Sequence, residues 1–129
     1  MTTDLWMLAA AAVLQWALIL AASTPRMLKN GISWAMGNRQ KPVEGLPQWA
    51  TRAQKASDNL QENLILFAIV VLVVHVSGNA NETSALGTQI FVGARLLHAL
   101  IYIAGLAVIR TAAWMTSIAG MFIAASTLA

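Results

Sequence analysis

The sequence has no cysteine and few charged residues, and each shortage excludes whole classes of protein. Without cysteine the chain can form no disulfide, no thiolate metal site and no cysteine nucleophile. Only 10% of the 129 residues are charged, whereas a soluble domain carries about 25%. A soluble helical bundle needs a charged surface, and eight basic and five acidic side chains are too few to make one.

Apolar residues, by contrast, make up 58% of the chain, and the mean hydropathy of +0.66 is typical of an integral membrane protein. The length allows about four spans of ~20 residues. The first apolar run follows Asp4 rather than basic residues and is long enough to span, so we interpret it as a retained helix and not as a signal peptide. We therefore expect an all-α integral membrane protein of one domain, a four-transmembrane-helix up-and-down bundle with helices at about 5–22, 52–76, 85–104 and 111–128.

The segment Ser23–Gln48 is polar and rich in glycine and proline, which predicts a loop. Pro25 is expected just past the end of the first helix, and Ile32–Met36 is expected to form a short interfacial segment. Basic residues gather in this loop, at Arg26, Lys29, Arg39 and Lys41, whereas the 77–84 loop has none. The positive-inside rule then places the first loop in the cytoplasm and both termini on the opposite side. Because the loops are minimal, we expect a bacterial inner membrane.

The 52–76 helix combines a polar beginning with an apolar end. Its purely apolar part, Leu64–Val76, is too short to cross about 30 Å of hydrocarbon at about 1.5 Å per residue. Polar residues such as Asn59 and Glu62 must therefore lie below the membrane surface. A charge at the bilayer centre costs about 2.5–3.5 kcal/mol, so these groups are expected to face the protein interior or water and to find partners.

The 85–104 helix carries a matching polar face, because Arg95, His98 and Tyr102 are spaced three and four residues apart. The two helices are antiparallel, and counting residues from their ends places Glu62 and Arg95 at similar depth. We expect these two side chains to form an ion pair, which by itself could be only a structural clamp. The 111–128 helix has a ridge of small residues that is expected to pack against another helix; it consists of Ala112, Thr116, Gly120 and Ala124.

The whole polar set is larger than a clamp requires and gathers toward the cytoplasmic half of three helices. Its members are Arg52, Lys55, Asn59, Glu62, Arg95, His98, Tyr102, Arg110 and Thr111. Basic groups suit the carboxylates of an anionic ligand, a glutamate suits an ammonium, and amide and phenol groups add directed hydrogen bonds. We therefore expect a polar ligand site. No further His or carboxylate completes a metal site with His98 and Glu62, and no phosphate loop, Ser-His-Asp set or nucleic-acid motif is present.

Two motifs in this set resemble the MAPEG family, the membrane-associated proteins of eicosanoid and glutathione metabolism. The first is "RAQKASDNLQEN", which has Arg52, Ala56, Asn59 and Glu62 at family positions. The second is "RLLHALIYIAGLAVIRT", which has Arg95, His98, Tyr102, Arg110 and Thr111 in register. The likeness runs from about Gly37 to Trp114, and it is the combination of the two motifs that makes it specific.

The resemblance implies a small bacterial-type member: a homotrimer of four-helix protomers, with a glutathione site between protomers near the cytoplasmic face. It implies a glutathione-dependent membrane transferase or peroxidase acting on lipophilic electrophiles from the bilayer. Arg110 and Thr111 match an arginine and an adjacent hydroxyl that activate the glutathione thiol in active members, since a nearby cation lowers the pKa of a thiol. The residues implied to bind glutathione are Arg26, Arg52, Lys55, Asn59, Glu62, Arg95, His98 and Tyr102.

Asp58 departs from the family pattern, in which many active members have a basic residue immediately before the Asn of this helix. A carboxylate at that position would oppose a glutathione carboxylate unless it faces elsewhere. Two alternatives therefore stand beside the enzyme. One is a non-catalytic lipid-binding scaffold of the same family. The other is a small multidrug transporter using Glu62, although the several buried basic residues argue against a path for cations.

Overall fold

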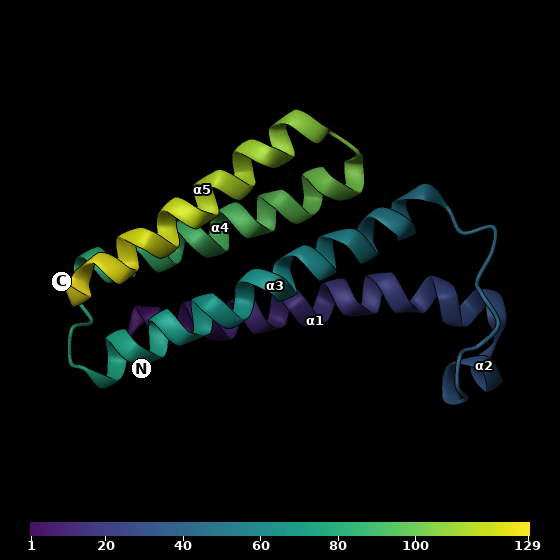
Figure 1. The fold of residues 1–129 in the computed structure, drawn as a ribbon, viewed down its shortest axis with the longest axis horizontal. Coiled ribbons are helices and arrows are strands. Elements are labelled where there is room, and N and C mark those ends of the chain that lie inside the picture. Colours follow the sequence, from purple (N-terminus) through teal and green to yellow (C-terminus); the bar gives the residue numbers. More distant parts are fainter.

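The computed structural model describes all 129 residues, and the chain is helical with no strand (Figure 1). Its elements are α1 (Thr3–Asn30), α2 (Ile32–Met36), α3 (Gln48–Val76), α4 (Glu82–Ala104), α5 (Ala107–Ala125) and a final 3-10 turn η1 (Ser126–Leu128). The four long helices are each long and apolar enough to cross a membrane. The predicted all-α bundle of four spanning helices and the short helix at Ile32–Met36 are thus confirmed.

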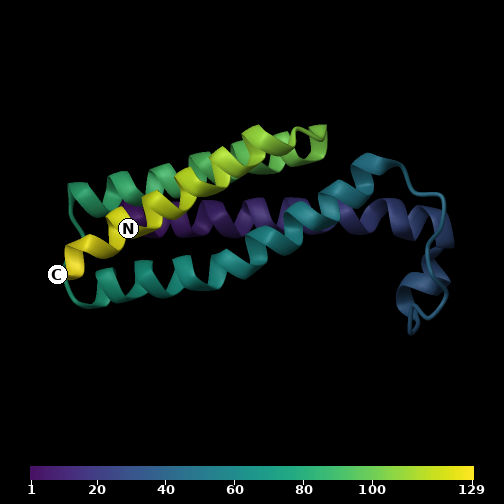
Figure 2. The same cartoon turned by 45° about the horizontal axis from the view of Figure 1, so that its top comes forward.

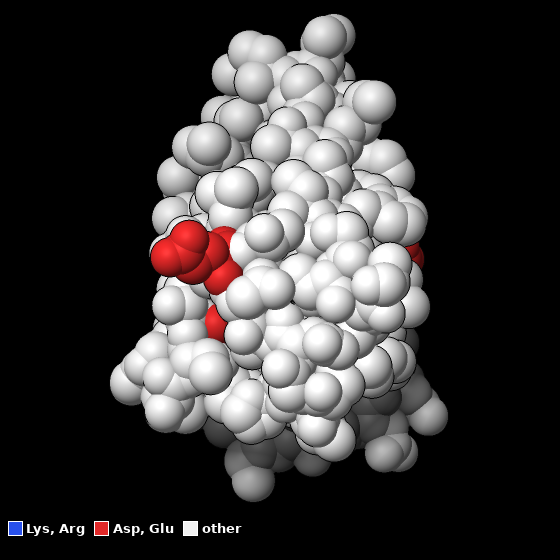
Figure 3. All heavy atoms as spheres, turned by 90° about the vertical axis from the view of Figure 1, so that its left-hand side faces the viewer, with Lys and Arg blue, Asp and Glu red and all other residues white.

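The four long helices run up and down, so that both termini lie at one end of the bundle and α2 lies at the other (Figures 1 and 2). Helix α1 packs mainly on α3, and α4 packs mainly on α5, while α3 and α4 join the two pairs. Viewed from the end that carries the termini, the surface shows acidic side chains and no lysine or arginine (Figure 3). Four of the eight basic residues lie at the opposite end, in the last turns of α1 and in the first loop; they are Arg26, Lys29, Arg39 and Lys41.

Small residues bring α4 and α5 into close contact. A Cβ atom added to Gly87 would lie 2.5 Å from the Ala124 backbone nitrogen, and one added to Gly120 would lie 2.7 Å from the Gly87 carbonyl oxygen. Of the predicted ridge on α5, Gly120 and Ala124 are buried in this contact, whereas Ala112 and Thr116 are exposed. The hairpin of α4 and α5 is therefore joined most tightly in the half that lies near the C-terminus.

The end of α1 was predicted wrongly, because the helix continues through Pro25 to Asn30. Proline removes one backbone donor and usually bends or ends a helix. Here the Ser23 hydroxyl donates to the Ile19 carbonyl, and the Arg26 guanidinium donates to the Ala22 carbonyl, so side chains add hydrogen bonds in the turns around the proline. The helix stops at Gly31, whose φ of 90° is one that residues other than glycine rarely adopt.

The connection between α4 and α5 is shorter than predicted. Gly105 adopts the left-handed conformation (φ 86°), and its N–H bonds to the Ile101 and Tyr102 carbonyls, which ends α4 in the usual manner of a helix C-terminus. Helix α5 then begins at Ala107 instead of 111. As a result Arg110 lies within the first turn of α5, directly across from the last turns of α4.

Candidate functional site

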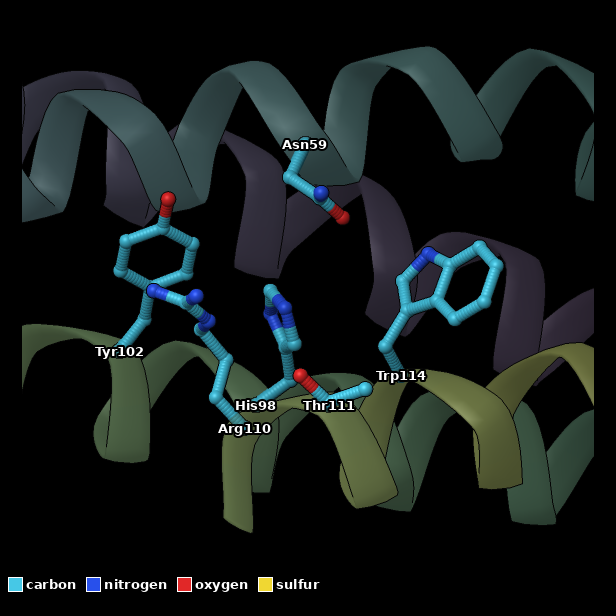
Figure 4. Close-up of a pocket in the computed structure, with 6 residues that line it drawn as sticks. All are labelled: Asn59, His98, Tyr102, Arg110, Thr111 and Trp114. Atoms are coloured by element: carbon cyan, nitrogen blue, oxygen red, sulfur yellow. The ribbon is translucent and has the colours of Figure 1, made fainter. Parts of the chain in front are cut away.

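A cleft of about 250 Å³ lies where α3 faces the α4–α5 hairpin; we call it the polar cleft (Figure 4). Its lining consists of Asn59 from α3, His98 and Tyr102 from α4, and Arg110, Thr111 and Trp114 from α5. All of these except Trp114 belong to the predicted site. Residues separated by up to 55 positions in the sequence therefore share one cavity at the end of the hairpin that carries the α4–α5 turn.

The turn at Gly105 places the aromatic and basic groups of the polar cleft against one another. The Arg110 guanidinium carbon lies 4.3 Å from the centre of the Tyr102 ring, a distance at which a cation and an aromatic face attract. One helical turn earlier, the His98 ring meets the Tyr102 ring edge-on, with ring centres 5.5 Å apart. The Tyr102 ring thus lies close to both nitrogen-bearing side chains of the polar cleft.

Arg95 lies behind the polar cleft with only 1% of its surface exposed. Its Nη2 donates to the Asn59 backbone oxygen at 2.8 Å and to the Asn59 side-chain oxygen at 2.9 Å. Its Nε and Nη1 have no hydrogen-bond partner, which is unusual for a buried guanidinium. Arg95 therefore fixes the orientation of Asn59 and retains donors for a further acceptor.

The predicted ion pair between Glu62 and Arg95 is wrong, because Arg95 bonds to Asn59 and Glu62 is exposed. The residue count gave the two side chains similar depth, but depth does not determine the direction in which a side chain leaves its helix. Glu62 is rotated away from the buried face of α3, whereas Asn59 lies at the edge of that face.

The other predicted residues of α3 lie outside the polar cleft. Arg52 binds the end of α4 instead, since its Nε donates to the Ile103 carbonyl at 2.8 Å, one of the carbonyls that a helix end leaves unpaired. Lys55 is exposed on the same outer face as Glu62. Asp58 is exposed too, and it accepts a hydrogen bond of 2.8 Å from Gln54 on its own helix.

The structure also changes the membership of the predicted site at Arg26 and Trp114. Arg26 lines a separate cleft with Arg39, near α2, and not the polar cleft. Trp114 lines the polar cleft, although it was not among the predicted site residues. It follows Arg110 by four residues, so the spacing that places side chains on one helix face could have identified it.

The sequence profile of the MAPEG family matches residues 3–129, which is essentially the whole chain. The chain belongs to the MAPEG family. As a MAPEG protein it is a multi-pass membrane bundle in a family that includes glutathione-dependent transferases and peroxidases together with other members. Neither the comparison with curated proteins nor the comparison with solved structures gives a significant match.

Glutathione carries two carboxylates, one ammonium and a thiol, and the donor groups of the polar cleft suit its carboxylates. The polar cleft offers the Arg110 guanidinium, the Tyr102 and Thr111 hydroxyls and the Asn59 amide. No acidic side chain lines it, and the two unpartnered nitrogens of Arg95 add positive charge behind it. Such a set favours an anion, and guanidinium groups in particular suit carboxylates.

Proposed function

We propose that this MAPEG protein is a glutathione-dependent membrane transferase or peroxidase that acts on lipophilic electrophiles. The observation that carries the proposal is the shared polar cleft, in which Arg110 and Thr111 lie beside Tyr102, His98 and Asn59. Membership of a family that includes such enzymes supports it.

Arg110 is the residue that we expect to activate the thiol. When bound, glutathione would supply a sulfur nucleophile: its thiol proton would pass to water, and the thiolate would add to the electrophilic carbon or displace a leaving group from it. A guanidinium beside the sulfur stabilises the thiolate and lowers the pKa of the thiol. The Tyr102 ring holds Arg110 in place, and the neighbouring Thr111 hydroxyl, now bonded to the Ala107 carbonyl at 3.2 Å, can donate to the sulfur instead.

We further propose that a neighbouring copy of the chain completes the site in a homotrimer. Lys55, Asp58 and Glu62 are all exposed on one side of α3, and charged side chains facing hydrocarbon are strongly disfavoured. The polar cleft, at about 250 Å³, is also smaller than the usual ligand pocket of about 300–1,000 Å³. A second protomer on this side would cover the charges and enclose the ligand, and Lys55, Glu62 and Arg52 would then contact glutathione at the subunit boundary.

The test uses purified protein in detergent, with glutathione added up to millimolar concentration. Glutathione is expected to raise the unfolding temperature of the wild type and of Arg39→Ala, which removes an arginine remote from the polar cleft. Arg110→Ala is expected to lose most of the conjugation of a model electrophile. Absence of both stabilisation and conjugation in the wild type would reject the proposal.

The non-catalytic lipid-binding alternative makes a different set of predictions. It requires a trimer that binds an amphiphile and shows no turnover. Amphiphile binding should then be the same in the wild type and in Arg110→Ala. Asp58 is the residue that favours it, but the carboxylate bonds to Gln54 and does not line the polar cleft. Asp58→Arg tests whether this carboxylate opposes glutathione. The substitution should strengthen glutathione binding only if the Asp58 carboxylate repels the ligand.

A further inference from the structure

A second cationic cleft lies at the C-terminal part of α1, where the helix meets α2. This arginine cleft has a volume of about 180 Å³, and its polar lining consists of Ser23, Thr24, Arg26, Trp34 and Arg39. No acidic residue lines it. The cleft therefore combines two positive charges and two hydroxyl groups with no compensating negative charge.

Both guanidinium groups retain free donors. Arg26 donates through Nη1 to the Ala22 carbonyl, and Arg39 donates through Nε to the Ala35 carbonyl at 3.0 Å. Because a guanidinium carries five N–H donors, each arginine has several left for an external acceptor. Two such forks facing one cleft suit the oxygens of a phosphate group.

The local backbone holds Arg39 in the cleft. Arg39 is the one residue other than glycine with a positive φ, at 54°, a conformation that L-residues seldom adopt. This turn directs its guanidinium back over the Trp34 ring, 5.5 Å from the ring centre. The Trp34 indole in turn donates to the Lys41 carbonyl at 2.7 Å, so the loop and α2 are tied together around the arginine.

An apolar groove of about 450 Å³ adjoins the arginine cleft on the surface of α1. Leu20 and Thr24 line both cavities, and the groove continues over Pro25, Leu28 and Trp49. Four of the groove's six lining residues are hydrophobic, and Leu28 is 76% exposed. A cationic cavity and an apolar groove therefore meet along one short stretch of helix.

The position of the arginine cleft and the apolar groove along α1 corresponds to the boundary of a bilayer. Helix α1 has 28 residues and so extends for about 42 Å, more than the ~30 Å of hydrocarbon. Arg26 lies 22 residues beyond Asp4, or about 33 Å along the axis, which reaches the headgroup level when Asp4 lies at the other surface. The groove around Leu20 is one to two turns deeper, at the level of acyl chains.

We propose that the arginine cleft binds the phosphate of an anionic phospholipid from the leaflet on the α2 side of the membrane. Arg26 and Arg39 bind the phosphate oxygens, the Thr24 hydroxyl donates a hydrogen bond, and one acyl chain lies in the groove formed by Leu20, Leu28 and Trp49. Charge complementarity selects an anionic lipid, and the groove distinguishes a lipid from a free phosphate. Arg26 then serves a lipid and not glutathione.

The experiment measures lipid retention on the purified full-length protein by native mass spectrometry. The protein in detergent is mixed with equal amounts of phosphatidylglycerol and phosphatidylcholine of the same acyl chains. The wild type is expected to retain phosphatidylglycerol at least tenfold over phosphatidylcholine. Arg26→Ala with Arg39→Ala should abolish that preference, whereas Lys29→Ala with Lys41→Ala removes the same charge from the same end and should preserve it.

Two further measurements separate the sources of the phosphate. Inorganic phosphate and glycerol phosphate, which have no acyl chain, are expected not to displace the lipid at millimolar concentration, and Leu28→Asp should weaken lipid retention with both arginines present. Displacement by inorganic phosphate would show a simple anion site. Equal losses in the two double variants, or equal retention of the two lipids by the wild type, would overturn the proposal.

Discussion

Replacement of Gly87 by alanine tests the close contact of α4 and α5 in the half of the hairpin that lies away from the polar cleft. A Cβ at this position would lie 2.5 Å from the Ala124 nitrogen and 2.6 Å from the Gly120 oxygen. The shorter distance is about 1 Å less than normal van der Waals contact, which is about 3.5–4.0 Å between carbon atoms. Because both opposing atoms belong to a helix backbone, the added methyl group can be accommodated only if the two helices separate.

Overpacking of this kind costs about 1–3 kcal/mol. Alanine is also the better helix former, by about 1 kcal/mol, and this gain offsets part of the loss. Gly93→Ala is the matched control on the same helix, because a Cβ at Gly93 would meet nothing within 4 Å. The helix-forming gain is common to the two variants, so the difference between their free energies of unfolding isolates the clash.

The assay is equilibrium unfolding of both variants in the same detergent. We expect Gly93→Ala to be at least as stable as the wild type and Gly87→Ala to be less stable than Gly93→Ala by about 1–3 kcal/mol. Equal stability of the two alanine variants would refute the helix contact described here.

Three further substitutions test buried polar groups, each by the same unfolding measurement. Asn59→Leu leaves the buried Arg95 guanidinium with a backbone acceptor only and should lower the free energy of unfolding by about 1.5–3 kcal/mol. Adding Arg95→Met to the same chain should recover a part of this loss, because the guanidinium that lacks its partner is then removed. If the effects of the two substitutions simply added, this would argue against the contact. Gln15→Leu removes a bond of 3.0 Å to the Ser57 hydroxyl and should cost only about 0.6 kcal/mol, the average for such bonds in membranes; a loss above about 2 kcal/mol would contradict this. Asp4→Asn should raise stability, because the carboxylate is buried with one oxygen unpartnered; a clear loss would show that the charge itself is needed.

The number of spanning helices and much of the polar cleft could be predicted from the sequence. Long apolar runs report helices directly, since about 20 residues are required to cross a bilayer. Spacings of three and four placed His98 and Tyr102 on one face, and the same rule applied to Arg110 would have added Trp114. These predictions succeeded because they depend on geometry within a single helix.

Predictions that depended on the relation between helices were less secure. Glu62 and Arg95 have similar depth, but the rotation of α3 turns Asn59 toward Arg95 and leaves Glu62 exposed. Arg52 was assigned to a ligand only, and its hydrogen bond to the carbonyl of Ile103 at the end of α4 was not foreseen. Neither outcome can be read from spacing, because each depends on how two helices are rotated about their own axes.

Helix ends followed local chemistry that composition does not reveal. Pro25 was expected to lie beyond the first helix, yet hydrogen bonds from Ser23 and Arg26 accompany the continuation of α1 to Asn30. This extension places Arg26 one turn before the helix end and next to α2. The arginine cleft is a consequence of that extension and could not be foreseen from the predicted loop.

The most direct test of the central claim is the ultraviolet absorbance of glutathione thiolate on mixing with the purified protein near neutral pH. The account predicts that thiolate absorbance appears with the wild type and with Arg39→Ala and is lost with Arg110→Ala. No thiolate signal with the wild type at saturating glutathione, or an undiminished signal with Arg110→Ala, would contradict the claim that Arg110 in the polar cleft activates the thiol.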